Sequence, residues 1–333
     1  MTRIWVGSIV ALLLLSSVVL VAIRPAAVSS SQNLALAEYP APGGSLHDAV
    51  PDGKGWVWYT AVGGGQGSIG GINPATGETV VVPLGASSAP HGIIMGPDGA
   101  AWITDGGLNA IVRIDTDTLG VTQYRLPGAA ASLNTATFDN RGVLWYTGQS
   151  GYFGSVNPAT GAVTQFNAPR GRGPYGIATA PDGTVYYASL AGSYLGRIDG
   201  DNGEVTVLDP PTPNAGVRRV WVDSQNRPWV AEYNVGQLGR YDPATGQWAE
   251  WRLPGGQPRP YAIFVDERDH VWLSDHALGG SGGANSLVHF DPSAETFTTV
   301  PSEAPLRVAQ LGGVRGEIWG ADRNRQRVVV VRY

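Results

Sequence analysis

Two histidines, His47 and His91, are the side chains of this 333-residue chain that are best suited to proton chemistry. Asp105 follows His91 after one predicted strand and turn, which brings its carboxylate to the same end of the predicted sheet. A carboxylate beside an imidazole raises the basicity of the ring and orients it for proton transfer. His91 with Asp105 is therefore a candidate general base. The alternative is a pair of histidines that only satisfy hydrogen bonds inside a channel.

The elements that must position these residues repeat seven times. Each copy contains an apolar strand, an Asp- and Gly-rich turn, a strand with a marker aromatic residue, and two further strands. A repeat of roughly 43 residues with four short strands is typical of propeller blades. The pattern predicts an all-β, seven-bladed β-propeller over residues 34–333. The marker aromatics are Trp58, Trp102, Trp145, Tyr186, Trp229, Trp272 and Trp319.

The two ends of the repeat region are predicted to close the ring. The seventh copy has strands around 306–311, 317–321 and 327–333, after which the given sequence stops. The segment Leu36–Pro40, before the first copy, has the pattern of the missing fourth strand. Pairing this segment into the last blade removes two exposed strand edges. We therefore expect the N-terminal strand to complete the last blade.

Fourteen positions are predicted to meet at one mouth of the central channel, because first strands start there and second strands end there. Their variety is what a binding site requires and what a structural repeat does not explain. Within one blade, Arg218 and Glu232, or Arg307 and Asp322, are alternatively expected to form structural ion pairs. The first-strand set is His47, His91, Asn134, Tyr175, Arg218, Tyr261 and Arg307. The second-strand set is Ala61, Asp105, Gly148, Ser189, Glu232, Asp275 and Asp322.

Composition excludes several classes of protein. Cysteine is absent, so neither disulfides nor a thiolate metal site contributes to stability or chemistry. The net charge of −5 argues against a nucleic-acid binder, which normally carries a basic face. We expect a monomer that takes a small-molecule or peptide-like ligand at the channel mouth.

The N-terminus differs from the rest of the chain. Residues 4–23 contain no charged side chain and are long enough to span a bilayer as one helix. Residues 1–33 are therefore interpreted as a signal peptide or a signal anchor with a short linker. No cysteine follows the apolar segment, which excludes a lipoprotein anchor. We expect the propeller to be exported, and either secreted or held at the membrane by residues 4–23.

The run Pro90-His91-Gly92-Ile93, followed after nine residues by Trp102-Ile103-Thr104-Asp105, resembles the blades of the streptogramin B lyases. These virginiamycin B lyase-like proteins are seven-bladed propellers. Further matching elements are Gly196-Arg197-Ile198 and Gly239-Arg240-Tyr241. The resemblance covers nearly the whole chain after residue 34, although other propellers share these blade motifs.

The resemblance implies roles for residues at the mouth. His91 matches the general base of the family, His47 a second histidine that contacts substrate, and Asp105 a carboxylate that helps to bind Mg²⁺. The family has a glutamate two residues before the base, where this chain has Ala89. With one carboxylate missing, Arg218 or Arg307 would have to stabilise the negative charge that develops on the substrate. The further residues expected to bind substrate are Tyr175 and Tyr261.

The chemistry implied by the resemblance is that of a carbon–oxygen lyase, which opens a cyclic ester by β-elimination. The competing interpretation is a non-enzymatic, extracytoplasmic propeller that binds a ligand or partner through the same mouth. A third class, the metal-dependent lactonase-like propellers, requires Glu, Asn and Asp ligands around the axis. Only Asn134 and either Asp275 or Asp105 would begin such a set.

Overall fold

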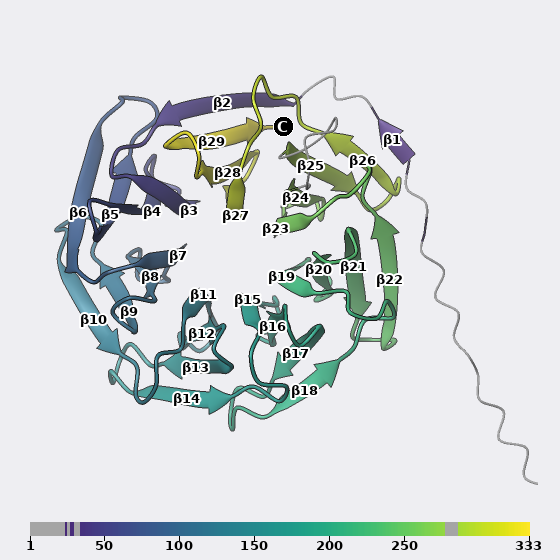
Figure 1. Cartoon of the computed structure of the whole chain (residues 1–333), viewed down its shortest axis with the longest axis horizontal. Helices are drawn as coiled ribbons and strands as arrows, with labels where there is room; N and C mark the ends of the chain where they lie inside the picture. The colour runs from purple at the N-terminus through teal and green to yellow at the C-terminus, as the bar shows by residue number, and fades with distance from the viewer. Residues whose placement is uncertain (1–23, 25–26, 30–33, 277–285) are drawn as a thin grey trace, which may run out of the picture.

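Seven antiparallel sheets form a closed ring around a central channel in the computed structural model (Figure 1). The structure describes residue 24 and residues 27–29, 34–276 and 286–333. The predicted membrane segment 4–23 and the Gly-rich loop 277–284 lie outside these residues. In the part of the chain that is described, no helix is long and apolar enough to cross a bilayer.

The first four blades follow the chain in order, each with its first strand at the channel and its fourth at the rim. Blade one contains β3 (Ser45–Pro51), β4 (Val57–Gly63), β5 (Gln66–Ile72) and β6 (Thr79–Ala86). Blade two contains β7 (Pro90–Met95), β8 (Ala101–Asp105), β9 (Ala110–Ile114) and β10 (Val121–Arg125). Blade three contains β11 (Leu133–Phe138), β12 (Leu144–Gly148), β13 (Tyr152–Val156) and β14 (Val163–Asn167). Blade four contains β15 (Pro174–Thr179), β16 (Val185–Ser189), β17 (Tyr194–Ile198) and β18 (Val205–Leu208).

The last three blades include both N-terminal strands. Blade five contains β19 (Val217–Val222), β20 (Pro228–Glu232), β21 (Gln237–Asp242) and β22 (Gln247–Arg252). Blade six contains β23 (Pro260–Val265), β24 (Val271–Asp275), β25 (Ser286–Asp291) and β26 (Thr296–Thr299), with β1 (Ala27–Ser29) added in parallel. Blade seven contains β27 (Val308–Val314), β28 (Glu317–Asp322) and β29 (Arg327–Arg332). Its fourth strand is β2 (Ala35–Pro40), antiparallel to β29, so the predicted closure of the ring is confirmed.

The marker aromatics all lie in the second strands of their blades, as the repeat predicts, and all are buried. In several blades the indole N–H donates a hydrogen bond to an aspartate in the preceding turn. Trp145 donates to Asp139 at 3.1 Å, and Trp229 to Asp223 at 2.9 Å. Burial of a large apolar side chain stabilises the folded state by about 1.5–3 kcal/mol. In these blades the marker aromatic thus joins the turn to the core between neighbouring blades.

Each first strand carries one more residue than the second strand opposite it. In blade one, His47 and Asp48 lie between two paired positions and together oppose Thr60. The same shift of register occurs in the other six blades. A β-bulge of this kind interrupts the alternation of side chains and redirects one of them. Two consecutive residues of one strand therefore reach the channel.

Candidate functional site

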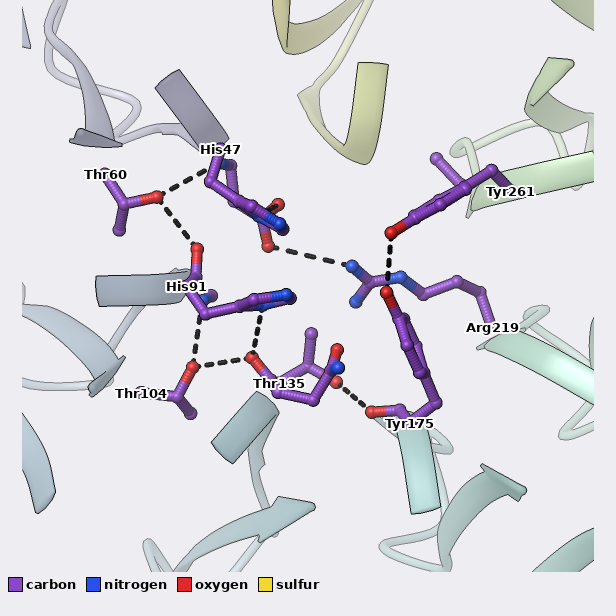
Figure 2. A network of polar contacts seen from close by, with 12 residues as sticks. His47, Thr60, His91, Thr104, Thr135, Tyr175, Arg219 and Tyr261 are labelled. Atoms are coloured by element: carbon purple, nitrogen blue, oxygen red, sulfur yellow. Dashed lines mark hydrogen bonds and ion pairs between the residues drawn. The ribbon is translucent and has the colours of Figure 1, made fainter. Parts of the chain in front are cut away.

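The rings of His47 and His91 lie against each other, tilted by 42°, at one end of the channel, which we call the functional mouth (Figure 2). Their ring centroids are 3.6 Å apart. The Nδ1 atom of His91 donates to the backbone carbonyl of Asn134 at 3.0 Å, which leaves the lone pair of the neutral ring on Nε2. Hydroxyl bonds from Thr60 to the His91 carbonyl and from Thr104 to the Asn134 carbonyl hold blades one to three together. The predicted histidine pair is therefore assembled on neighbouring blades.

Electrostatics keep His91 in its neutral form. Burial lowers the pKa of His91 well below the ordinary value of 6.5. The nearby His47 ring and the Arg219 guanidinium lower this pKa further, since each disfavours a second positive charge. A neutral imidazole with a free Nε2 is the protonation state that a general base requires.

The carboxylate beside the histidine pair is Asp48. Its Oδ1 accepts a hydrogen bond from Nδ1 of His47 at 2.7 Å, and the residue is fully buried. This contact orients the His47 ring and leaves its Nε2 available as an acceptor. Sequence reasoning missed Asp48 because simple strand alternation places it on the face opposite to His47. The bulge in β3 brings both side chains to the channel.

Asp105, which the sequence suggested as the partner of His91, has a different role. Its Oδ2 accepts the hydroxyl of Ser88 at 2.5 Å. Its Oδ1 accepts the backbone N–H groups of Ala89, Gly107 and Leu108 at 2.9 to 3.0 Å. The carboxylate is fully buried and binds the loops of blade two together. Asp105 is thus placed as a structural anchor and is not in hydrogen-bond contact with His91.

The opposite side of the mouth is filled by a cage of aromatic rings around Arg218. Its Cζ lies 3.6 Å from the ring centroid of Tyr261, 4.3 Å from that of Tyr175 and 4.6 Å from that of Tyr233. Its Nη2 donates to the Tyr175 hydroxyl at 2.7 Å, and the Tyr175 and Tyr261 hydroxyls are 2.5 Å apart. Burial raises the pKa of Tyr175 to about 12, so this phenol remains protonated at neutral pH. We call these residues the Arg218 cage.

Arg219 follows Arg218 directly in β19. Like Asp48, it is a functional side chain that sequence reasoning did not single out. It reaches across the channel from β19 towards Asp48, with Nη2 3.9 Å from Oδ2 (Figure 2). Only 3% of its side chain is exposed, yet Nε, Nη1 and Nη2 have no hydrogen-bond partner. The side-chain amide of Asn134 and Oδ2 of Asp48 are also buried without a partner. Buried polar groups of this kind normally find a partner, so the channel centre is prepared for a ligand or water.

Blade seven contributes a small residue in place of the predicted arginine. Val308 pairs with Asp322, so Ala309 takes the place that His91 has in blade two. Ala309 is buried beside Tyr175 and Tyr261, whereas Arg307 precedes β27 and is exposed. The seventh repeat lacks the Pro-x-Gly run that marks this position in blades two and four, and the predicted residue lies two positions before the observed one.

The two ion pairs suggested by the sequence are not among those of the described residues. Asp322 accepts Nε of Arg325 at 2.7 Å. Glu232 lies beside Glu250 of the same blade, and burial together with this neighbour raises the pKa of Glu232 well above its ordinary value. His276 also lies at the functional mouth, with its ring centroid 4.5 Å from that of Tyr261. Its Nε2 is 2.8 Å from the Val308 carbonyl, and burial lowers its pKa to about 4.

The residues at the functional mouth do not fit the Mg²⁺ site implied by the resemblance. Both oxygens of Asp105 are occupied by the protein's own donors, and Ala89 offers no side-chain ligand. The one ligand cluster found in the described ranges is His47, Asp48 and His91, whose donor atoms lie within 4.8 Å of one another. Two nitrogens and one carboxylate suit a transition metal better than Mg²⁺, which prefers oxygen ligands.

Fold and site together define a closed seven-bladed propeller with a polar, histidine-bearing channel mouth. Residues 24–282 match the model of the virginiamycin B lyase family, and the chain belongs to that family. No sequence among curated proteins matches it.

Solved structures of similar fold include several lyases. Virginiamycin B lyase from Staphylococcus aureus is 21% identical, with a TM-score of 0.80 over 90% of this chain and 100% of that chain. A catalytically inactive variant of the same enzyme, with quinupristin, gives a TM-score of 0.79 at 21% identity and the same coverage. A streptogramin B lyase gives 0.79 at 19% identity over 90% of this chain and 98% of that chain. At these identities the likeness shows the fold.

Proposed function

We propose that this protein is a carbon–oxygen lyase that opens a cyclic ester by β-elimination at the functional mouth. The observation that carries the proposal is the His47–His91 pair, in which His91 is neutral and its Nδ1 is held by the Asn134 carbonyl. Membership of the virginiamycin B lyase family supports the same reaction class. The proposed substrates are cyclic depsipeptides in which a threonine-derived residue carries the ester oxygen, as in type B streptogramins.

The proposed reaction uses residues of this chain alone. Nε2 of His91 takes the α-proton of the threonine-derived residue. The electron pair of that C–H bond forms the Cα=Cβ double bond, and the bond from Cβ to the ester oxygen breaks. The leaving group is a carboxylate, so the ring opens without addition of water and His91 holds the proton. His47, oriented by Asp48, is proposed to hold the substrate beside the base.

Negative charge develops on the substrate carbonyl as the α-proton leaves, and a positive group must stabilise it. Arg219 is the better candidate for this role than Arg218. The donors of Arg219 are buried and have no partner, whereas Arg218 is held by three tyrosine rings. Arg307 is exposed before β27. We therefore assign the electrophilic role to Arg219, and no step of the proposed reaction passes through Mg²⁺.

The direct test is incubation of the purified protein with a type B streptogramin. β-Elimination gives a linear product of unchanged mass that carries a new vinyl proton signal in NMR spectra, whereas hydrolysis adds one water. We expect His91→Gln to lower kcat/KM by about 10²- to 10⁴-fold, the usual contribution of a general base. His270→Gln is the matched control, because His270 lies in the turn before β24 at the opposite end of the channel.

A ligand-binding propeller without catalysis is the second candidate. It is favoured by one observation, namely that Ala89 and the occupied Asp105 leave no Mg²⁺ site of the family kind. The two candidates separate in a binding experiment with the same compound. Binding that survives in both His91→Gln and wild type, with no linear product from either, contradicts the lyase and supports the binding protein.

We further propose that the propeller is exported and that residues 4–23 engage the membrane. Arg24 follows this segment directly and contacts two blades at the outer rim. Its backbone N–H donates to the Glu250 carbonyl at 3.0 Å, and its Nη1 lies 2.5 Å from Oε1 of Glu295. Fractionation of cells and N-terminal sequencing of the mature chain test this proposal. Recovery of the full-length chain in the cytoplasm contradicts it.

A further inference from the structure

A second cavity occupies the end of the channel opposite to the functional mouth. Its volume is about 410 Å³, which is within the range of small-molecule sites. The later residues of the first strands form its wall, whereas the histidines come from the early residues. We call it the lower channel cavity. Lining residues that matter here are Asp48, Met95, Phe138, Trp221, Phe264 and Gly312.

The wall of the lower channel cavity is mainly apolar and aromatic. The rings of Trp221 and Phe264 lie 4.7 Å apart, and both side chains remain only partly buried. The hydroxyls of Thr137 and Thr179 bond to each other at 3.0 Å, which satisfies this polar part of the wall. Apolar surface that stays accessible in a cavity favours a ligand that removes it from water.

One buried polar atom indicates which kind of ligand the cavity would bind. Asp48 lines the cavity and is fully buried, and its Oδ2 has no hydrogen-bond partner. The Oε1 atom of Gln310, a second lining residue, is likewise without a partner. Leaving a buried acceptor unpaired costs about 1–3 kcal/mol, so a ligand that donates a hydrogen bond there gains affinity.

The charges around Asp48 favour a ligand that is neutral and carries a hydrogen-bond donor. Nη2 of Arg219 lies 3.9 Å from the same Oδ2 atom and repels a cationic head group. The Asp48 carboxylate in turn repels an anionic one. An elongated, neutral, aromatic or alicyclic molecule with one N–H or O–H group at its end meets both conditions.

We infer that the lower channel cavity binds a neutral apolar molecule through a hydrogen bond to Asp48 Oδ2, separately from the proposed reaction site. Asp48 joins the two ends of the channel, because its Oδ1 holds His47 while the residue also lines the cavity. A donor at Oδ2 draws charge from the carboxylate and weakens its hold on the His47 ring. Occupation of the cavity is therefore transmitted to the functional mouth. The inference does not depend on the lyase activity.

The probe for the test is 2-naphthol, which is neutral at pH 7, aromatic and carries one O–H donor at its end. Met95 lines the cavity, and the only other methionine of the chain is Met1. In wild-type protein labelled with ¹³C at the methionine methyl groups, we expect the Met95 signal to shift saturably with one equivalent of probe. ¹⁵N spectra of the histidine side chains should show a concurrent shift for His47 and none for His270.

Gly312→Phe fills the cavity and provides the specificity test. A Cβ at Gly312 meets no atom closer than 3.4 Å, so the new side chain enters without backbone displacement. We expect the affinity for the probe to fall at least tenfold. Gly120→Phe, in an exposed turn of blade two where the nearest atom is also 3.4 Å away, is the matched control and should bind as wild type.

The wild-type experiment stands even where Gly312→Phe fails to fold. An unchanged Met95 methyl signal at saturating probe overturns the binding site. A Met95 shift without any change at His47 overturns the coupling through Asp48. Equal affinity of folded Gly312→Phe and wild type also overturns the site, because the probe then binds elsewhere.

Discussion

The two sides of the functional mouth use the same bulged strand position in opposite ways. On the side of blades one and two, His47 and His91 keep their Nε2 acceptors directed away from their protein partners. On the side of blades four to six, Arg218 and the tyrosines hold one another through stacking and hydrogen bonds, and Nε is the one Arg218 nitrogen that is buried without a hydrogen bond. One side is arranged for chemistry on a ligand, and the other is a packed wall.

The neighbouring arginines of blade five show the difference most directly. Arg218 and Arg219 are adjacent in β19, and the bulge sends both to the channel. Arg218 lies over three rings at 3.6 to 4.6 Å, whereas Arg219 has three buried nitrogens without a hydrogen bond. Buried donors without a hydrogen bond destabilise a fold even where a carboxylate lies 3.9 Å away, so their presence points to a function. Two adjacent arginines therefore have different roles in this site.

Between the two arginines, the larger expected effect is on turnover, and it comes from Arg219→Met. Loss of one preorganised donor to a developing oxyanion lowers kcat by about 10²- to 10³-fold. The free energy of unfolding should fall, because the variant leaves the buried Asp48 carboxylate without the guanidinium 3.9 Å away. Turnover of the streptogramin and urea denaturation of the same preparation measure both quantities. Normal turnover in this variant would remove Arg219 from the proposed site.

Arg218→Met tests the packed side and should mainly lower stability. The variant loses contacts to three aromatic rings and a hydrogen bond to Tyr175. Cation–π contacts and a charged hydrogen bond together suggest a loss of about 2–3 kcal/mol. Denaturant unfolding measures it, with Arg172→Met as control, since Arg172 is exposed before β15. If Arg218→Met unfolds like wild type, the cage is not a stabilising element.

The ring and its closure followed from the sequence because they depend on periodic features. Aromatic spacing placed all seven second strands, and the pattern of Leu36–Pro40 identified the closing strand. The site was only partly predictable. The structure places His47, His91, Tyr175 and Tyr261 at the mouth, and Pro-x-Gly runs at the starts of β7 and β15 mark the positions of His91 and Tyr175.

The remaining site residues depended on bulges and contacts that leave no simple trace in the sequence. Asp48 and Arg219 reach the channel because the strand alternation is interrupted. Asp105 points to loop N–H groups, which no spacing rule predicts. Arg307 was misplaced because the seventh blade begins its pairing at Val308. The turn aspartates that bind indoles, by contrast, recur and are a usable signal.

Glu232 gives a smaller effect, confined to stability and dependent on pH. Burial, with the charge of Glu250, raises the pKa of Glu232 well above 4.5 in the folded state. The folded protein then holds a proton that the unfolded chain has released, so stability falls as pH rises from about 4.5 through the folded pKa. Glu232→Gln keeps a donor for Glu250 and should be more stable than wild type at pH 8 by about 1 kcal/mol. Unfolding measured at pH 5 and pH 8 should show a flatter dependence in the variant, and equal slopes would contradict this reading of the pair.

The smallest expected effect concerns the protonation of His91 itself. Burial, the His47 ring and Arg219 lower its pKa well below 6.5, so wild-type His91 should stay neutral through pH 6.5. Arg219→Met removes one of these positive charges and should raise the pKa of His91. Titration of the ¹⁵N histidine signals measures this shift without any need for turnover. His276 is the internal control, because burial is the main cause of its pKa of about 4, and the arginines that chiefly lower this pKa further are Arg307, Arg218 and Arg323. A His91 pKa that does not move, while His276 also stays fixed, would separate Arg219 electrostatically from the base and leave burial and His47 as the groups that keep His91 neutral.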